Sequence, residues 1–519
     1  MTDAGSANPD EMRLIARWVT LGAVALSLAY AALLIFVASP ASFYTLDDPY
    51  IHMALAENIA RGHFGVNPGE YANPSSSIAW PWLLAAFEKL GVMLYAPLLV
   101  NITCFVATVR VILAFSLKRM AGDARAARNA LILLGLALLA FNVFGVIFTG
   151  MEHSLHVLLS VVAVTRLIDA KYDRWTLLVL MLGPLVRFEG AIVLAFGVGA
   201  ALVDRRWMFA GLAVPAAIAP VALYGWWLTS LGLPALPSSV LSKSAAAGVV
   251  VDGGGGVAGG LLATFLNNAQ SPAGPLLGVM ALGLAYGAWK RSGRDRVLAL
   301  GLVVVLVLAM MLGRMDSYAR YEVYVFCVIA MGLVHLLQPE LHVLAQSLVR
   351  SAVLGMGVAL LGGSLGVYVF ATTPLGARNI DRQQHQMHRL VTECWRQPVA
   401  VNDLGWVSFR NDAYVLDLWG LGSEEARKAR SAGEPGWMAK LATDKNVGLA
   451  MVYPGWFEGD LPPEWTAMGE IGFTERGITP FAPATTIFAT YPDAQDEIRA
   501  CMQRLSDSSP AGGLVKILD

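Results

Sequence analysis

Residues 17–48 read RWVTLGAVALSLAYAALLIFVASPASFYTLDD, so a long apolar run is followed closely by two adjacent acids. An apolar run of about 20 residues crosses the hydrocarbon core of a bilayer as a helix. The run is too long for the apolar region of a secretory signal, so we interpret it as an uncleaved spanning helix. Adjacent carboxylates repel each other. Asp47 and Asp48 therefore need a helix N-terminus, a cation, a metal or a catalytic role.

The composition places most of the chain in a membrane. Hydrophobic residues make up 56% of the 519 residues and charged residues 14%, and the mean hydropathy is +0.57. A soluble protein has about 25% charged residues. The net charge of -1 gives no indication of nucleic-acid binding.

Apolar runs of spanning or nearly spanning length recur along the chain and predict about 11 transmembrane helices. They cover residues 17–38, 93–116, 129–148, 154–168, 174–187, 190–204, 207–229, 273–289, 297–313, 321–338 and 349–371. Lys and Arg gather in alternate connections, which places the N-terminus in the cytoplasm and the C-terminus outside. The sequence thus predicts a multi-pass protein of the plasma (inner) membrane.

One further apolar segment, SSSIAWPWLLAAFEKLG (75–91), is short and is predicted to be an interfacial or re-entrant helix. Trp80 and Trp82 would then lie at headgroup depth. The predicted membrane domain, residues 1–371, has two long outer loops, 39–92 with juxtamembrane helices and 229–272. The glycine-rich stretch DGGGGVAGG (252–260) in the second loop follows no strand and is predicted to be a flexible hinge.

Residues 372–519 are predicted to form a small extracytoplasmic α/β domain. Short β-prone runs such as TTIFATY alternate there with polar helical stretches such as SEEARKAR. Cys394 and Cys501 both fall in this domain, where an oxidising compartment permits a disulfide, and the sequence leaves their pairing open. Cys104 and Cys327 fall within predicted spans and are expected to be inert packing residues.

The polar residues without an anchoring task gather on the predicted outer side. Besides the acidic pair, they lie in TGMEHS (149–154), VRFEG (186–190), LPALPSSVLSKS (233–244) and RMDSYARYEVY (314–324). Each has a structural alternative: a helix cap for one of the acids, a polar turn, an interfacial anchor or a loop residue. Carboxylates and cations that face one outer cavity instead suit a reaction on an anionic lipid headgroup.

The predicted chemistry is an inverting glycosyl transfer from a lipid phosphate. An aspartate takes the proton of an acceptor hydroxyl while the oxygen attacks the anomeric carbon. The departing phosphate needs Arg or Lys to balance its charge. The sequence indicates no cofactor and leaves a divalent metal open.

These motifs resemble the GT-C membrane glycosyltransferases over nearly the whole chain. The segment GHFGVNPGEYANPSSSIAWPWLLA (62–85) after the acidic pair, the later outer motifs in the same order, and VNDLGWVSFRNDAYVLDLWGLG (401–422) are similar to the group of the mycobacterial terminal arabinofuranosyltransferases. The protein O-mannosyltransferases and the lipid A aminoarabinose transferases are more distantly similar. The resemblance implies a polyprenyl-phosphate sugar donor and a glycan, lipid or protein acceptor of the cell envelope.

The resemblance also implies roles for individual residues. Asp47 matches the first acid of the family's pair and is favoured over Asp48 as the base, and Glu152 matches the acid of the second outer loop. The cations expected to face the donor phosphate are Arg187, Lys243 and Arg320. The residues expected around the acceptor or the cavity are His52, His153, Glu189, Tyr321 and Glu322. Pro49 and Phe188 depart from the family pattern and leave the sugar and acceptor open.

Two other functions stay open on the sequence. A ligase that moves a whole lipid-linked glycan would use a similar outer face, and paired arginines in a large outer loop would favour it. A transporter would need polar or broken helices near the membrane midplane. The predicted spans 297–313 and 349–371 are apolar through their middles, which favours the transferase.

Overall fold

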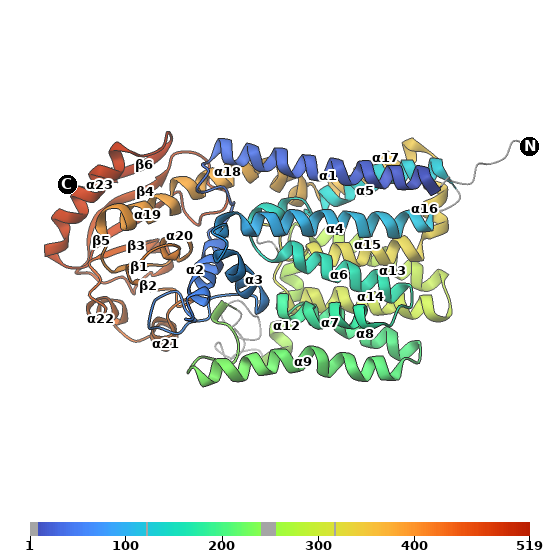
Figure 1. The fold of residues 1–519 in the computed structure, drawn as a ribbon, viewed down its shortest axis with the longest axis horizontal. Helices are drawn as coiled ribbons and strands as arrows, with labels where there is room; N and C mark the ends of the chain where they lie inside the picture. The colour runs from blue at the N-terminus through green and yellow to red at the C-terminus, as the bar shows by residue number, and fades with distance from the viewer. Residues whose placement is uncertain (1–8, 121–122, 240–255, 316–317, 519) are drawn as a thin grey trace, which may run out of the picture.

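The structure, a computed structural model, describes residues 9–120, 123–239, 256–315 and 318–518. A bundle of long helices carries a small domain with a β-sheet at one of its ends (Figure 1). The first helix begins at the opposite end of the bundle, and the C-terminus lies in the small domain. We call the end of the bundle that contacts the C-terminal domain the near end, and the opposite end the far end.

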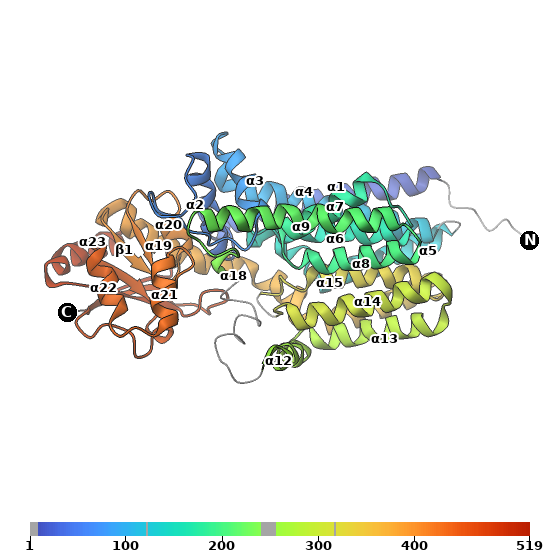
Figure 2. The ribbon, with the colours of Figure 1, turned by 90° about the horizontal axis from the view of Figure 1, so that it is seen from below.

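The bundle helices lie roughly parallel or antiparallel to one another in both ribbon views (Figures 1 and 2). They are α1 (Pro9–Val37), α4 (Ala96–Arg119), α5 (Ala124–Ala140), α6 (His153–Ile168), α7 (Arg174–Val186), α8 (Gly190–Val203), α9 (Trp207–Ser230), α13 (Gly274–Lys290), α14 (Gly293–Leu312), α15 (Val323–Leu336) and α17 (Leu348–Leu361). The other helices of this part are α2 (Asp48–Ala60), α3 (Ala79–Glu88), α12 (Gly256–Gln270), α16 (Gln338–Ala345) and α18 (Tyr368–Arg382).

The bundle has the character of a polytopic membrane protein. Within the described ranges, 5 helices are long and apolar enough to cross a membrane, or up to 8 if each bent pair of helices is one span. Three shorter apolar helices, α6, α7 and α8, coincide with three of the remaining predicted spans. The predicted fold class is therefore confirmed, whereas the number of 11 spans stays a prediction.

One local prediction about the bundle is wrong in part, and another gains a detail. Residues 256–260 of the glycine-rich stretch that was expected to be a flexible hinge are helical, because α12 begins at Gly256, whereas residues 252–255 lie outside the described residues. The amide of Asn268 explains how this helix is held, because it donates to the carbonyls of Met310 and Gly313, both at 2.8 Å. Tertiary packing thus overrides the low helix propensity of glycine. The predicted span 349–371 falls in a bent pair of helices, in which the chain turns by 78° after α17, and such a pair can form one broken span.

Helices α2 and α3 lie across the near end of the bundle, between it and the C-terminal domain (Figure 1). Most of α2 is buried, and α3 packs against it. The two tryptophans of α3 differ, since Trp80 is fully buried whereas Trp82 is 48% exposed. Residues two apart point to nearly opposite faces of a helix. Trp82 is therefore available to contact lipid whereas Trp80 packs inside the protein, and the predicted headgroup depth of the two side chains stays a prediction.

The C-terminal domain contains a six-stranded mixed sheet in the order β2-β1-β3-β5-β4-β6, in which β2, β1 and β3 are parallel. The strands are β1 (Val399–Val401), β2 (Val415–Asp417), β3 (Leu449–Val452), β4 (Thr466–Phe473), β5 (Ala484–Ala489) and β6 (Gly513–Ile517). The helices are α19 (Gln384–Arg389), α20 (Gly405–Ser408), α21 (Glu424–Ala432), α22 (Trp437–Asp444) and α23 (Gln495–Asp507). Helix α18 crosses the predicted boundary between residues 371 and 372 and links the two parts.

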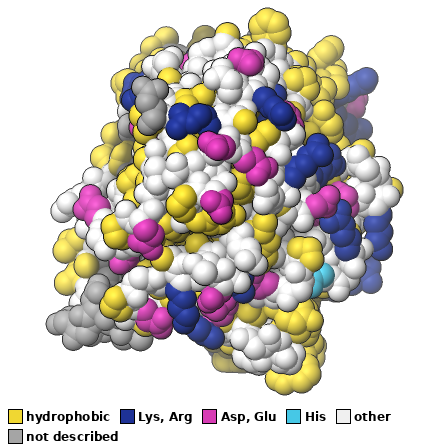
Figure 3. All heavy atoms as spheres, turned by 90° about the vertical axis from the view of Figure 1, so that its left-hand side faces the viewer, with side chains coloured by type: hydrophobic (Ala, Val, Ile, Leu, Met, Phe, Trp, Pro, Cys, Tyr) yellow, Lys and Arg dark blue, Asp and Glu magenta, His cyan; other side chains and the backbone are white. Residues whose placement is uncertain are grey.

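Both faces of this sheet are covered by apolar side chains that alternate along the strands. Ala400 of β1 and Ala450 of β3 pack with α21 and α22. Val399 and Val401 of β1 belong to the larger core, which includes α19 and α23. On the outward end of the domain, acidic and basic side chains are interspersed (Figure 3). The predicted α/β domain is confirmed.

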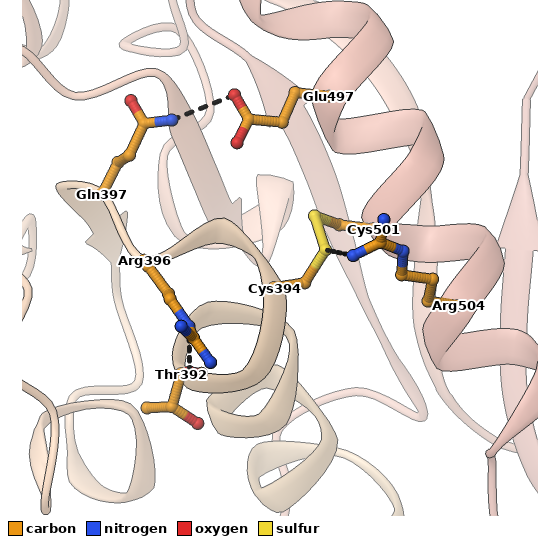
Figure 4. The surroundings of a disulfide bond; sticks show 7 residues. All are labelled: Thr392, Cys394, Arg396, Gln397, Glu497, Cys501 and Arg504. Atoms are coloured by element: carbon orange, nitrogen blue, oxygen red, sulfur yellow. Dashed lines mark hydrogen bonds between the residues drawn. A yellow bond between two sulfur atoms is a disulfide. The ribbon is translucent and has the colours of Figure 1, made fainter.

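Cys394 and Cys501 form a disulfide, which the sequence left open (Figure 4). It joins the segment before β1 to α23 across 107 residues of sequence, with a Cα–Cα distance of 5.6 Å. Nearby, the amide of Gln397 donates to Glu497 of α23 at 3.0 Å. Cys104 and Cys327 are buried free thiols, as expected.

Removal of this disulfide is expected to weaken the C-terminal domain. A crosslink over a loop of this length restricts the unfolded chain and typically stabilises by about 2–4 kcal/mol. The double variant Cys394→Ser/Cys501→Ser should therefore unfold at a lower temperature than the parent, as measured by thermal denaturation of the full chain in detergent. A reducing agent should lower the Tm of the parent and leave that of the variant unchanged. Equal Tm values for parent and variant would contradict a stabilising role.

Candidate active site

The two adjacent acids bind different partners. Asp47 is buried, and its carboxylate accepts hydrogen bonds from the backbone N–H groups of Gly405 (2.7 Å) and Trp406 (2.8 Å) at the start of α20. Asp48 is the first residue of α2, and its carboxylate lies 2.8 Å from a guanidinium nitrogen of Arg320. One acid thus reaches the C-terminal domain while its neighbour faces the helical bundle.

One of the two acids was expected to cap the helix that follows it, but Asp47 caps α20 rather than α2. Asp47 precedes α2, but its side chain makes no capping hydrogen bond to α2. Pro49 occupies the first turn of α2 and has no N–H to donate. The N–H groups that open α20 take the carboxylate instead. Only glycine fits at position 405, because a Cβ there would lie 2.4 Å from Oδ2 of Asp47.

A tight turn brings Glu152 to the same place. Gly150 has a φ of 68°, and a Cβ on it would lie 2.7 Å from the Cβ of Pro49. The turn before α6 therefore packs directly on the start of α2. Glu152 is fully buried, and its Oε1 accepts from Arg187 at 2.6 Å and from the hydroxyl of Ser76 at 3.1 Å.

Arg187 lies buried between two carboxylates. One guanidinium nitrogen donates to Glu152, and the other donates to Glu189 at 2.8 Å. The first nitrogen also lies 3.2 Å from Nε2 of His153. Paired carboxylates offset the large cost of burying a guanidinium. The short segment between α7 and α8 therefore places a compensated cation at the near end of the bundle.

Tyr321 joins the two ion-pair groups. Its ring lies 4.9 Å from the guanidinium carbon of Arg187 and 5.0 Å from that of Arg320, distances at which cations interact with an aromatic face. The ring of His153 lies 5.4 Å from it. The groups Asp48–Arg320 and Glu152–Arg187–Glu189 thus form one continuous cluster.

The remaining expected residues lie around this cluster. Nε2 of His52 is 3.9 Å from Glu152, and its Nδ1 is 3.0 Å from the hydroxyl of Ser75. Glu322 is 1% exposed and directly precedes α15. Lys243 lies outside the residues that the structure describes. The structure brings together the expected residues of the acidic pair and of the three outer motifs that it describes.

A cavity of about 290 Å³ opens beside the cluster. Part of its wall is polar and includes Arg187, Glu189 and Tyr321. Another part is apolar and consists of Phe188, Ala191, Ile192 and Leu312. Arg314 also lines the cavity; it is exposed and forms no ion pair with any residue that the structure describes. Arg314 was not among the residues expected in the site, although it opens the motif that contains Arg320.

A third carboxylate comes from the C-terminal domain. Oδ2 of Asp403 accepts from the amide of Gln384 at 2.8 Å and from the hydroxyl of Tyr453 at 3.4 Å. Burial is the main cause that raises the pKa of Asp403 to about 6, and the negative charge of Asp48 adds to it. Burial, followed by the charge of Asp403, raises the pKa of Asp47. The three acids therefore lie close enough to act on one another electrostatically.

This arrangement has the means for proton transfer and anion binding. Its carboxylates can accept a proton, and its arginines and the nearby cavity can hold an anion. Within the described part of the chain, no three or more His, Cys, Asp or Glu side chains are grouped so that they could hold a metal ion.

Part of the chain matches a family model. Residues 378–491, within the C-terminal domain, match a family described as a domain of unknown function, DUF8728. This match assigns no activity to the domain. No curated protein sequence matches the chain.

Solved structures of membrane transferases are similar in fold. The structure of ArnT from Cupriavidus metallidurans in the apo state is similar over 92% of this chain and 99% of that chain, with a TM-score of 0.51 and 14% identity. The Archaeoglobus fulgidus oligosaccharyltransferase in complex with zinc and sulfate matches over 90% of this chain and 73% of its own, with a TM-score of 0.45 and 14% identity.

The mycobacterial arabinofuranosyltransferase AftD matches over 92% of this chain but only 42% of its own, with a TM-score of 0.44 and 15% identity. Identities this low describe the fold alone. On the similarity to ArnT over nearly the whole of both chains, this protein has the fold of the GT-C membrane glycosyltransferases, a polytopic helical domain followed by a small C-terminal domain.

Proposed function

We propose that this protein is an integral-membrane glycosyltransferase that moves a sugar from a polyprenyl-phosphate donor to an acceptor of the cell envelope on the extracytoplasmic side. The observation that carries the proposal is the cluster of buried acids and arginines, which lies beside a cavity with a charged wall and an apolar wall. A GT-C fold surrounds this cluster.

The cavity suits the two chemically different parts of a lipid phosphate. Phe188, Ile192 and Leu312 offer apolar contact to a prenyl chain, and Arg314 offers a cation to the phosphate. Arg187 is already balanced by Glu152 and Glu189, so it contributes less net positive charge than Arg314. Arg320 forms an ion pair with one carboxylate, that of Asp48. Its positive charge stabilises the negative charge that develops near the reacting atoms.

The reaction we propose is a single displacement at the anomeric carbon. The acceptor oxygen forms a bond to that carbon, the bond from the carbon to the phosphate oxygen breaks, and the phosphate keeps the electron pair. The acceptor proton passes to an aspartate. The resemblance favours Asp47 as this base, but both oxygens of Asp47 accept backbone hydrogen bonds. We therefore assign the base to Asp48, which is 31% exposed at its side chain.

The other acids then have supporting roles. Glu152 is fully enclosed and bonded to Arg187 and Ser76, so it positions the arginine and the loop before α3. Glu189 holds the other side of the same guanidinium. Asp47 fixes the C-terminal domain against the start of α2.

Two features support the extracytoplasmic side for the near end. The far end contains the basic connections, where Lys118 and Arg119 pair with Asp169, and cations concentrate on the cytoplasmic side of membrane proteins. The Cys394–Cys501 disulfide lies beyond the near end, and disulfides persist in oxidising compartments.

The direct test uses the purified protein in lipid nanodiscs with a panel of polyprenyl-phosphate sugars that differ in the sugar. Release of polyprenyl phosphate with at least one donor, in the presence of cell-envelope glycans, is the expected result. If the protein releases no polyprenyl phosphate from any donor and does not bind undecaprenyl phosphate, the proposed function is wrong.

Substitution of each acid separates the base from the structural residue. Asp48→Asn removes the proton acceptor, and we expect transfer to fall by about a hundredfold to ten-thousandfold while undecaprenyl phosphate still binds. Asp47→Asn keeps one acceptor oxygen for the α20 N–H groups, so it should retain more transfer and lose more thermal stability. Transfer rates and Tm values of both variants are the measurement. Full transfer in Asp48→Asn would return the base to Asp47 or to another acid.

Removal of the cavity cation should weaken lipid-phosphate binding. Arg314→Gln keeps much of the side-chain length and loses the charge, so we expect a roughly tenfold rise in the Kd for undecaprenyl phosphate, measured by its displacement of a fluorescent lipid phosphate. Arg61→Gln, which removes a cation from the end of α2, is the matched control and should leave the Kd unchanged. An equal Kd for Arg314→Gln and the parent would remove Arg314 from the donor site.

The proposed orientation can be measured by cysteine labelling in intact cells. A cysteine at position 171, between α6 and α7 at the far end, should react only with reagents that enter the cytoplasm. A cysteine at position 412, exposed in the C-terminal domain, should react with an impermeant reagent from outside. Labelling of both positions from the same side would contradict the orientation.

A further inference from the structure

We propose that Asp403 of the C-terminal domain belongs to the reaction centre and binds a hydroxyl group of the acceptor beside Asp48. This inference rests on the proposed function, and it makes the C-terminal domain a part of the acceptor site. The substrate class that it implies is a neutral polyhydroxylated acceptor, such as a glycan terminus.

Asp403 lies at the edge of the sheet where ligands of α/β domains bind. It follows β1, and Tyr453, which donates to its carboxylate, follows the parallel neighbour β3. Ligands of open α/β sheets bind beyond the carboxyl ends of parallel strands. In this protein that edge is directed at the start of α2, because Gly405 and Trp406, just after Asp403, bind Asp47.

The contact between this edge and the helical bundle is extensive and buried. The ring of Trp406 stacks on Tyr50 of α2 with centroids 4.1 Å apart, and its indole N–H donates to Ser42 at 3.1 Å. The backbone N–H of Arg410 donates to Glu57 of α2 at 3.1 Å. Asp403 is therefore held in a fixed position relative to α2 and its first residue, Asp48.

Asp403 differs from the acids around it in what it still can bind. Asp47 is occupied by two N–H groups, and Asp417, at the end of β2, by three. Asp403 receives its hydrogen bonds from described residues at Oδ2 alone, and it forms no ion pair with them. An ionised carboxylate has about four acceptor positions on its two oxygens, so Oδ1 keeps capacity for a donor.

The partners of Asp403 fix its direction without neutralising it. The amide of Gln384 and the hydroxyl of Tyr453 are both uncharged, and the single proton of that hydroxyl is shared between Asp403 at 3.4 Å and the nearer side-chain oxygen of Gln383 at 2.7 Å. All three side chains are buried. These hydrogen bonds fix the orientation of the Asp403 carboxylate. Because the partners are uncharged, its negative charge remains available to a ligand.

The negative charge around Asp48 and Asp403 favours binding of the acceptor over binding of the donor phosphate. Asp48 follows Asp47 in the chain, and Asp403 lies two residues before Gly405, whose N–H binds Asp47, so the three acids are near one another. Of the three, only Asp48 has an ion-pair partner, Arg320, among the described residues. A phosphate would be repelled here, whereas sugar hydroxyls donate hydrogen bonds to carboxylates. The donor phosphate then belongs with Arg314 in the cavity, and the acceptor belongs between Asp48 and Asp403.

The test compares three variants of the full-length protein in nanodiscs. Asp403→Asn keeps the size and the Gln384 contact and removes the charge. Asp412→Asn, an exposed acid of the same domain, is the matched control. Gly405→Ala breaks the domain contact, because its Cβ would lie 2.1 Å from the backbone oxygen of Asp47. The assay uses a polyprenyl-phosphate sugar that the parent consumes and varies the concentration of a glycan that the parent glycosylates.

For Asp403→Asn we expect the KM for the glycan to rise by about tenfold or more, with the Kd for undecaprenyl phosphate and the Tm unchanged. Asp412→Asn should match the parent in all three values, and Gly405→Ala should lose transfer together with Tm. An unchanged glycan KM and rate in Asp403→Asn would overturn the inference while leaving the proposed function in place. A parent that consumes no donor would instead overturn the proposed function, and this inference with it.

Discussion

The carboxylate of Asp47, held by the N–H groups of Gly405 and Trp406, is the contact on which the rest of this arrangement depends. It joins segments 358 residues apart in sequence. Hydrogen bonds to a charged group contribute about 1.5–3 kcal/mol each, and an unpaired buried carboxylate would cost more. The contact also determines which edge of the sheet faces the bundle. As a result, Asp47 binds the C-terminal domain, whereas Asp48 faces the bundle and pairs with Arg320.

Buried charge is the second constraint, and the structure meets it by pairing. Arg187 and Arg320 are each 6% exposed, and each lies at hydrogen-bond distance from a carboxylate. Charges buried without partners would destabilise the fold by several kcal/mol. The ring of Tyr321 lies about equally close to the two guanidinium groups and interacts favourably with both. The chain can therefore keep two cations close together where a phosphate is proposed to leave.

The sequence predicted those features that depend on local pattern. Apolar runs of spanning length gave the helices of the bundle, and alternating short runs gave the α/β class of the C-terminal domain. Two helical features were missed for physical reasons. Helix α12 is held by contacts of Asn268 to the end of α14, which no local propensity reports. Trp80 faces the core because α3 packs on α2, and this tertiary contact cannot be predicted from the local sequence.

Some residues of the candidate site were likewise predicted from local motifs, whereas others depend on tertiary contacts. Motifs on the predicted outer side pointed to Glu152, Arg187 and Arg320, and these residues do lie in one cluster. The place of Asp403 next to the acidic pair follows only from how the two domains meet. A carboxylate in NDLGW, just after a β-prone run, was the available signal, since the ends of parallel strands form ligand sites. The partner of Asp47 likewise lies too far away in sequence to be read from it.

The position of the donor phosphate can be determined from a structure of the protein with undecaprenyl phosphate bound, solved by electron cryomicroscopy in nanodiscs. We expect density for the phosphate in the cavity lined by Arg187, Arg314 and Tyr321, on the side of Asp48 that faces the bundle, with the α20 contact to Asp47 intact. Phosphate density at the far end of the bundle, or in contact with Asp403, would contradict it.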